Sequence, residues 1–495
     1  MKRIVLLVII TIAGMLFLFI KNDDSHEVQI TINKDLYLFI RSTNGFTIKV
    51  EEKNSTEYTQ LINEETHFSV YDKKDKIGSV AVINKKIGKE NIFFLKANGE
   101  SKEFSLEIRL RSKMKVNNII ESLYDNNDLM VFNNKTNDSI NINNESQLYL
   151  DGENYSIRLG NPYYVEELGH SVIDVISNSN GWNIDSNKGI DTEIQLDVKD
   201  NMETNLEAII SSNKLVDFED KDTLDLIRRL DLYDKKIFRS DGIYYNIANN
   251  YIPYGRESKW NYPSGFPLII MYENIKDNNL FRLVGISLLY DYIDKFNEDY
   301  YIPSLPRSTW LYEDYNIDYE FYDTRFNTDT IMALIYWDQI IDEPRIKEII
   351  DNYFAFFIDY AYVNNWKTEN DGLFIPDYKN KDEEESKTHC SLNHLVSEIN
   401  AIYLYDKYYN CDNKYIILAE QMQQAIIDTY IDWIKDNNDF WYCIKQNGEY
   451  GLTDYRELTL KDMKLLVNLL NERGETVPKE FNKLIESKTK WLENN

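Results

Sequence analysis

Hydrophobic residues in the first part of the chain alternate with polar ones, which is the period of a half-buried β-strand. The clearest runs are 28–32, 46–50 and 104–110. Asn98 and Gly99 lie between the apolar runs 92–95 and 104–110, and this dipeptide is a signal for a hairpin turn. The pattern predicts an antiparallel β-sandwich or barrel over residues 27–115.

A polar stretch with six asparagines in residues 133–145 interrupts this pattern. The strand period returns in 148–159 and again in 194–198. We therefore predict a second β module over residues 117–215.

Beyond residue 221 the hydrophobic period becomes that of α-helices, most regularly in 346–361, with Pro344 placed to open the helix. Three more helical stretches are 328–341, 392–403 and 415–433, the second opened by Ser391. The stretch 280–296 is apolar nearly all round, which favours a position in an inner layer.

Helical pairs separated by long aromatic loops suit an α/α toroid, an incomplete α/α barrel, over residues 221–495. The alternative is an irregular helical bundle. The whole chain is predicted to be an α+β multidomain protein, with β modules followed by this toroid as the catalytic domain.

The N-terminus has the pattern of a membrane anchor. Lys2 and Arg3 precede an apolar run from 4 to 20, and the chain turns polar at Lys21. No small residues offer a signal-peptide cleavage site, so we expect residues 1–21 to remain as an uncleaved single-pass anchor. The positive-inside rule then places the N-terminus in the cytoplasm and the bulk of the chain outside.

Composition limits the classes of molecule that the chain can bind. The 495 residues carry 55 Lys plus Arg against 83 Asp plus Glu, a net charge of −28, which excludes nucleic acid as the main partner. The 37 Tyr, 22 Phe and 8 Trp suit the flat faces of sugars, or the filling of a helical core. Three cysteines are too few for a disulfide scaffold and have no zinc spacing, and no nucleotide or nucleophile-elbow motif is present, so we expect no cofactor and no metal.

Polar and aromatic residues crowd four segments between the helical stretches. Two of these segments contain Arg256 with Trp260, and Arg307 followed by Arg325. In so acidic a chain, guanidinium groups beside tryptophans predict clamps for a ligand that bears a carboxylate. The alternative is that each arginine pairs with a neighbouring acid.

The other two segments carry a recognisable order of short motifs. The first runs from Asp377 and Tyr378 to Asn393 and His394, which open a helix; the second holds Tyr442, Lys445 and then Tyr455 ahead of the last leucine-rich helix. This order, over about residues 365–470, resembles the C-terminal domain of the glucuronyl C5-epimerases, the heparosan-modifying family. The family layout of anchor, β modules and α/α domain matches the pattern above.

The resemblance implies that the family's acid and first tyrosine fall on Asp377 and Tyr378, and its other site tyrosines on Tyr442 and Tyr455. The sequence departs from the family in three places. Pro376 precedes the tyrosine instead of following it, His394 replaces a small residue, and Lys445 replaces an arginine.

Inverting C5 of a uronic acid requires two acid/base groups that flank the ring, and cations that hold the carboxylate. The catalytic candidates are therefore Tyr378, Tyr442, Tyr455 and Asp377, with tyrosine pKa values lowered by cationic neighbours. The candidate substrate-binding residues are Lys445, Arg256, Arg307, Arg325, Trp260, Asn393 and His394.

Several functions remain open beside the uronate C5-epimerase. A polysaccharide lyase abstracts the same proton. A glycoside hydrolase would need two convergent carboxylates, for which Glu313, Asp323, Asp329 and Asp377 are available. A non-catalytic surface carbohydrate-binding protein would use the aromatics alone. The expected partners are an acidic polysaccharide and the membrane, and a homodimer of the chain is left open.

Overall fold

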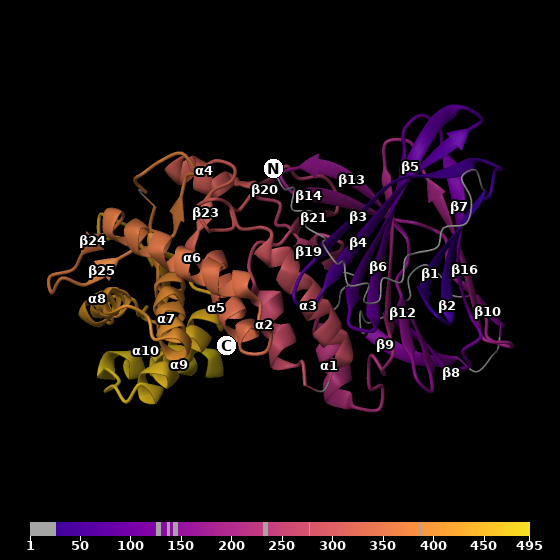
Figure 1. The fold of residues 1–495 in the computed structure, drawn as a ribbon. Coiled ribbons are helices and arrows are strands. Elements are labelled where there is room, and N and C mark those ends of the chain that lie inside the picture. The colour runs from indigo at the N-terminus through magenta and orange to yellow at the C-terminus, as the bar shows by residue number, and fades with distance from the viewer. Residues whose placement is uncertain are drawn as a thin grey trace, which may run out of the picture.

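The computed structural model describes residues 26–124, 130–135, 139–141, 147–230, 236–276, 278–386 and 388–495. A β-rich half is followed by a helical half (Figure 1). The predicted anchor, residues 1–21, lies outside the described residues. Among the residues that are described, no helix has the length and apolar character needed to cross a membrane.

The β-rich half is a sandwich of two antiparallel sheets. The smaller sheet has the order β1 (Glu27–Asn33), β2 (Leu36–Ser42), β7 (Phe104–Ser112), β16 (Ile190–Val198), β15 (Asn183–Asp185) and β10 (Ser139–Asn141). Its inward side chains, such as Ile30, Leu106 and Ile194, are buried in a core shared with the larger sheet. This is the strand alternation that the sequence predicted.

The larger sheet is branched at β17 (Glu203–Ser211), which pairs with β13 and β12 along one edge and with β6 along the other. Its remaining strands are β3 (Thr47–Glu57), β4 (Ile62–Asp72), β5 (Asp75–Ile87), β6 (Glu90–Gly99), β8 (Val116–Tyr124), β9 (Met130–Lys135), β11 (Gln147–Gly152), β12 (Ser156–Leu159), β13 (Tyr163–Gly169), β14 (Val172–Ser177), β18 (Lys236–Arg239), β19 (Gly242–Asn246) and β21 (Ser258–Asn261).

Three sequence-based expectations about the β region were wrong. The two modules predicted as 27–115 and 117–215 share both sheets, because β7 pairs with β16 and β6 pairs with β17. Asn98 and Gly99 do not turn a hairpin, because β6 and β7 belong to different sheets and the chain crosses between them. The sheet also continues past residue 221, through β18, β19 and β21.

The helical half has the arrangement of an incomplete α/α toroid. Helices α2 (Phe266–Glu273), α5 (Thr324–Asp338), α7 (Leu392–Tyr409) and α9 (Leu458–Glu472) contact one another in that order and form the inner layer. Each packs against the helix that follows it, respectively α3 (Asn279–Ile293), α6 (Pro344–Val363), α8 (Asn413–Thr429) and α10 (Lys479–Glu493). Two shorter helices are α1 (Lys221–Leu230) and α4 (Thr309–Tyr315).

Helix α6 begins at Pro344 and buries the whole predicted stripe from Ile346 to Ala361. Helix α5 begins about one turn before the predicted start, because the Asp323 side chain accepts a hydrogen bond from the Phe326 backbone N–H and caps the helix. Helix α3 is buried on nearly every side, yet it is not an inner helix. The β-sheet covers its outer face.

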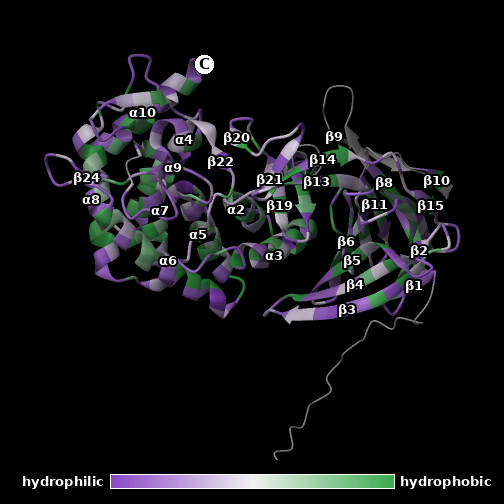
Figure 2. Ribbon diagram, turned by 90° about the horizontal axis from the view of Figure 1, so that it is seen from above, coloured by the Kyte–Doolittle hydropathy of each residue, from purple (hydrophilic) through white to green (hydrophobic). Residues whose placement is uncertain are grey.

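Contacts across that face join the two halves of the chain. Figure 2 shows α3 where the helices meet the strands, and it contacts both β5 and β19. The Lys85 ammonium of β5 lies 2.5 Å from Asp291 and 3.1 Å from Ser287, both on α3. One hydrophobic core includes side chains from β5, β6 and the helices, so the sheet and the toroid pack as a unit.

Candidate functional site

The predicted site residues meet where the inner helices begin. Asp323 and Ser391 immediately precede α5 and α7, and Tyr455 lies three residues before α9. Short antiparallel pairs hold these segments together: β23 (Tyr322–Asp323) with β26 (Tyr378–Lys379), and β27 (Cys390–Ser391) with β28 (Trp441–Ile444) and β29 (Tyr450–Thr453). The N-termini of three helices, with their partial positive charge, therefore point to one end of the toroid.

The three predicted tyrosines form a connected group. The hydroxyl oxygens of Tyr378 and Tyr442 are 3.4 Å apart. The rings of Tyr442 and Tyr455 pack edge to face, with their centroids 5.8 Å apart. Tyr378 and Tyr442 are only 6% and 7% exposed, whereas Tyr455 is 53% exposed. The group thus runs from the interior to the surface and reaches solvent at Tyr455.

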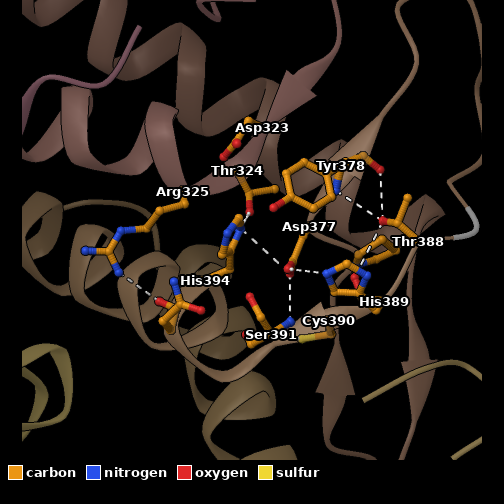
Figure 3. A network of polar contacts seen from close by, with 12 residues as sticks. Asp323, Thr324, Arg325, Asp377, Tyr378, Thr388, His389, Cys390, Ser391 and His394 are labelled. Carbon is orange, nitrogen blue, oxygen red and sulfur yellow. Dashed lines mark hydrogen bonds and ion pairs between the residues drawn. The ribbon is translucent and has the colours of Figure 1, made fainter. Parts of the chain in front are cut away.

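Asp377 lies behind the tyrosines, fully buried between two histidines (Figure 3). The Ser391 backbone N–H donates to its Oδ1 at 2.8 Å. His389 Nε2 is 3.3 Å from Oδ2, and His394 Nδ1 is 3.7 Å from Oδ1. Both imidazole rings also pack against the Tyr378 ring, with centroid distances of 5.7 and 5.5 Å. The histidines therefore hold the acid and the tyrosine in one geometry.

His389 was not among the predicted site residues, although its place five positions before His394 could have indicated a pair around one acid. The predicted His394 is buried and also contacts the Thr324 hydroxyl, 2.8 Å from its Nδ1. Burial lowers the pKa of His394 to about 4, so its imidazole is neutral at pH 7.

The pKa values of the tyrosines move opposite to the expected direction. Burial raises the pKa of Tyr378 and Tyr442 well above the ordinary value, and the negative charge of Asp377 raises both further. The pKa of Tyr455 is also raised, by burial and then by Asp323, although Arg325 opposes this. The three hydroxyls are therefore protonated at neutral pH, and the expected lowering by cations was wrong.

The pKa values of two carboxyl groups of the site are shifted in opposite directions. Burial raises the pKa of Asp323 to about 8, and the nearby charges of Asp377 and Asp329 add to the effect. Burial also opposes ionisation of Asp377, but the contacts with His394, His389 and Ser391 outweigh it and lower its pKa. Asp323 is therefore mostly protonated at pH 7, and Asp377 is ionised.

Arg325 is not available to clamp a ligand, which corrects its predicted role. Its guanidinium forms a buried bidentate pair with Asp462 of α9, at 2.5 and 3.2 Å, and its Nε lies 3.0 Å from Asp329. The same guanidinium donates to the backbone carbonyl of Asn393 at 3.1 Å. Arg325 and Asn393 thus tie together the first turns of α5, α7 and α9.

The other predicted binding residues lie in different surroundings. Trp260 is 5% exposed and packs among aromatic rings, including those of Tyr251 and Tyr262. It is therefore part of the hydrophobic core and not a ligand-binding residue, which corrects its predicted role. Arg307 stacks over Tyr312, with its guanidinium carbon 4.3 Å from the ring centroid. Arg256 is exposed, and so is Lys445 in the turn after β28.

Sequence reasoning also missed a buried cation that supports Tyr455. Lys488 of α10 has no exposed side-chain surface, and its Nζ lies 2.5 Å from Asp439 and 2.8 Å from Asp454. This pairing fixes the residue next to Tyr455. Within the described part of the chain, no three His, Cys, Asp or Glu side chains are placed to hold a metal ion.

The sequence matches no known protein family, and no curated protein matches it. Among solved structures, similar chains include the cellobiose 2-epimerase from Bacillus thermoamylovorans B4167, with 16% identity over 46% of this chain and 58% of the epimerase and a TM-score of 0.34. A novel alpha-amylase from Clostridium perfringens has 16% identity over 54% of this chain and 68% of its own, with a TM-score of 0.35. The unsaturated glucuronyl hydrolase from Bacillus sp. GL1 has 9% identity over 46% and 60%, with a TM-score of 0.33.

These structural neighbours are carbohydrate-acting enzymes. The chain spans 58% of the epimerase and 60% of the hydrolase, less than two thirds of either. Similarity at this level assigns no activity to the chain.

Proposed function

We propose that the chain is a carbohydrate-active enzyme that moves the C5 proton of a uronic acid in an acidic polysaccharide, as a uronate C5-epimerase does. The observation that carries the proposal is the tyrosine group, in which the hydroxyls of Tyr378 and Tyr442 lie 3.4 Å apart and half-exposed Tyr455 opens the group to solvent. We also propose that the enzyme is held outside the cytoplasm by the apolar segment 4–20.

The geometry suggests separate roles for the tyrosines. Tyr455 is half-exposed, and the buried Tyr442 packs against its ring; in this proposal these two hydroxyls transfer protons at C5, one accepting the C5 proton and the other donating one. Tyr378, backed by Asp377 and the two imidazoles, would position Tyr442. Because the pKa values of Tyr442 and Tyr455 are raised, the tyrosine that acts as base must first lose its proton, so activity should increase as the pH rises above neutral.

The substrate carboxylate needs positive potential, which Arg325 does not supply because Asp462 and Asp329 occupy its guanidinium. The N-termini of α5, α7 and α9 converge here and favour a negative group. In this proposal the helix ends stabilise the enolate form of the carboxylate, and exposed Lys445 contributes at the rim.

A glycoside hydrolase is the second candidate, favoured by the opposite protonation states of Asp323 and Asp377. One protonated and one ionised carboxyl group is the requirement for acid and base in glycoside cleavage. However, Asp323 is 4% exposed and Asp377 is fully buried, whereas the residue Tyr455 is 53% exposed, so the carboxyl groups are less accessible to a sugar than Tyr455. A lyase would share the proton abstraction.

The test is to incubate the protein with glucuronate polymers in D₂O and to follow deuterium at C5, ultraviolet absorbance and new reducing ends together. Deuterium incorporation without absorbance, lost in Tyr455→Phe, is the expected result. Rising absorbance would indicate a lyase and new reducing ends a hydrolase. Absence of all three signals across several uronate polymers would overturn the proposal.

A further inference from the structure

A groove lies on the β-sandwich, apart from the tyrosine group. It has a volume of about 990 Å³ and lies along the smaller sheet, on strands β2, β7 and β16 and the turns beside them. Figure 1 places this sheet on the side of the molecule away from the helices. None of the site residues described above lines it.

The floor of the groove is an ordered row of side chains. Strand register places Tyr37 opposite Arg111, and Arg111 opposite Asp191. The Arg111 guanidinium lies 3.3 Å from Asp191 and 5.4 Å from the centre of the Phe39 ring. Tyr37 and Phe39 both point away from the sandwich core and are half-buried, so their rings form a platform on the sheet surface.

Two lysines border this platform without partners. Lys113 and Lys188 are exposed, and among the residues that the structure describes neither forms an ion pair or a side-chain hydrogen bond. Gly189 brings their two turns together: it has φ +123°, and a Cβ there would lie 2.2 Å from the Ser112 carbonyl oxygen. Only a glycine allows the turn of Lys188 to approach the turn of Lys113 so closely.

The balance of charge in the groove differs from that of the chain. Its lining contains four cations and three acids, in a protein whose net charge is −28. Asp191 pairs with Arg111 and Asp35 with Lys34 at 3.8 Å, whereas Asp185 keeps its charge and accepts a hydrogen bond from the backbone N–H of Asn187 at 3.0 Å. Four cations and three acids leave the lining with one net positive charge, and its lysines that pair with none of these acids are Lys113 and Lys188.

We infer that this groove binds an acidic polysaccharide, with sugar faces on Tyr37 and Phe39 and carboxylates on Lys113 and Lys188. Aromatic rings present flat apolar surface to a sugar face, and free ammonium groups complement its carboxylates. The inference concerns a non-catalytic binding site that would keep the polymer on the enzyme. Binding here does not depend on the reaction proposed for the tyrosine group.

The test measures binding of the full-length chain to heparosan, a glucuronate polymer, immobilised at its reducing end. Lys113→Ala/Lys188→Ala removes two exposed charge contacts and is expected to raise Kd roughly tenfold at low salt, an effect that shrinks at high salt. Tyr37→Ala should also weaken binding, whereas Tyr37→Phe, which keeps the ring, should not. Neither lysine pairs with any residue that the structure describes, so the double variant should remain folded.

Lys464→Ala/Lys490→Ala is the matched control, because it removes two exposed lysines of α9 and α10 and the same total charge. The control is expected to keep the wild-type Kd. Unchanged binding in the Lys113/Lys188 variant, or an equal loss in the control pair, would overturn the inference. Tighter binding of a single-stranded oligonucleotide or of neutral dextran than of heparosan would also overturn it. A failure of the proposed reaction would appear separately, as absent turnover with binding intact.

Discussion

Two buried aspartates, one at the sheet–helix interface and one at the candidate site, differ in what surrounds them. Asp291 lies 2.5 Å from the Lys85 ammonium, and burial raises its pKa only to about 6 because that cation opposes the effect. Asp323 is relieved only by backbone hydrogen bonds and is surrounded by other acids, and its pKa rises to about 8. At the interface the buried Asp291 carboxylate is paired with a cation, whereas at the site Asp323 remains mostly protonated at pH 7.

The same contrast holds for the cations. Within the larger β-sheet the Arg239 guanidinium is 3% exposed and pairs with Glu203 at 2.9 Å. At the site the Arg325 guanidinium pairs with Asp462 and Asp329, so its charge supports the helices, and among the described residues no lysine or arginine pairs with Asp323. Buried acids with strongly shifted pKa values are typical of functional sites.

The largest expected effect is a loss of stability when the buried Arg325 is replaced. Arg325→Met leaves Asp462 and Asp329 buried without a counter-charge and should lower the free energy of unfolding by about 3–5 kcal/mol. Arg345→Met is the control, because Arg345 pairs with Asp294 at a site where both side chains are nearly half exposed, and it should cost less than about 1 kcal/mol. Urea unfolding measures both, and equal losses would contradict a structural role for Arg325.

The next effect concerns activity and not stability. Tyr442→Phe and Tyr455→Phe remove hydroxyls proposed to transfer protons, and each should lower kcat by about 100-fold or more. The control is Tyr362→Phe on α6, whose exposed hydroxyl contacts Gln421 at 3.4 Å and should not affect turnover. Steady-state assays should also show a wild-type rate that increases with pH. A rate that falls above neutral pH would argue against a tyrosine base.

Replacing Asp323 should change how the stability of the protein depends on pH. Its folded-state pKa of about 8 exceeds the ordinary value of 3.8, so its contribution to stability is fully present below about pH 4 and is lost as the pH rises toward 8. Asp323→Asn can still cap α5 and should be more stable than the wild type at pH 8, with no gain at pH 4. Asp412→Asn, at the exposed cap of α8, is the matched control for an Asp-to-Asn change at a helix cap. Thermal unfolding across this range is the measurement.

The smallest effect belongs to Lys445, exposed in the turn after Tyr442. Lys445→Ala should raise KM for an acidic polymer by about two- to fivefold and leave kcat unchanged, because an exposed charge contributes up to about 1 kcal/mol. Lys464→Ala controls for the lost charge. A fall in kcat like that of Tyr442→Phe would instead place Lys445 at the reacting atoms.

The sequence predicted those elements that depend on local periodicity. The buried stripe of α6 and the alternating strands of the sandwich are hydrophobic patterns that repeat every few residues, so a single sequence shows them. The start of α7 after Ser391 is likewise a local signal. It could not show that β6 and β7 lie in different sheets, or that a sheet covers α3, because partners far along the chain decide both.

The sequence predicted which residues form the site, but not their ion pairs or the direction of their pKa shifts. The motif order brought Asp377, Tyr378, Tyr442 and Tyr455 into one list, and the structure places them together. It could not show that Asp462, 137 residues from Arg325, takes up that guanidinium. The direction of the tyrosine pKa shifts depends on burial and on the neighbouring acids, which only the folded chain defines.

The central claim, that Asp323 holds its proton because no cation of the described residues pairs with it, is tested most directly by the titration of Asp323 itself. Carbon-13 NMR of aspartate carboxyl groups, assigned with Asp323→Asn and Asp291→Asn, measures both pKa values in one sample. The account predicts that Asp323 titrates near pH 8 and Asp291 near pH 6. An Asp323 pKa at or below that of Asp291 would contradict it.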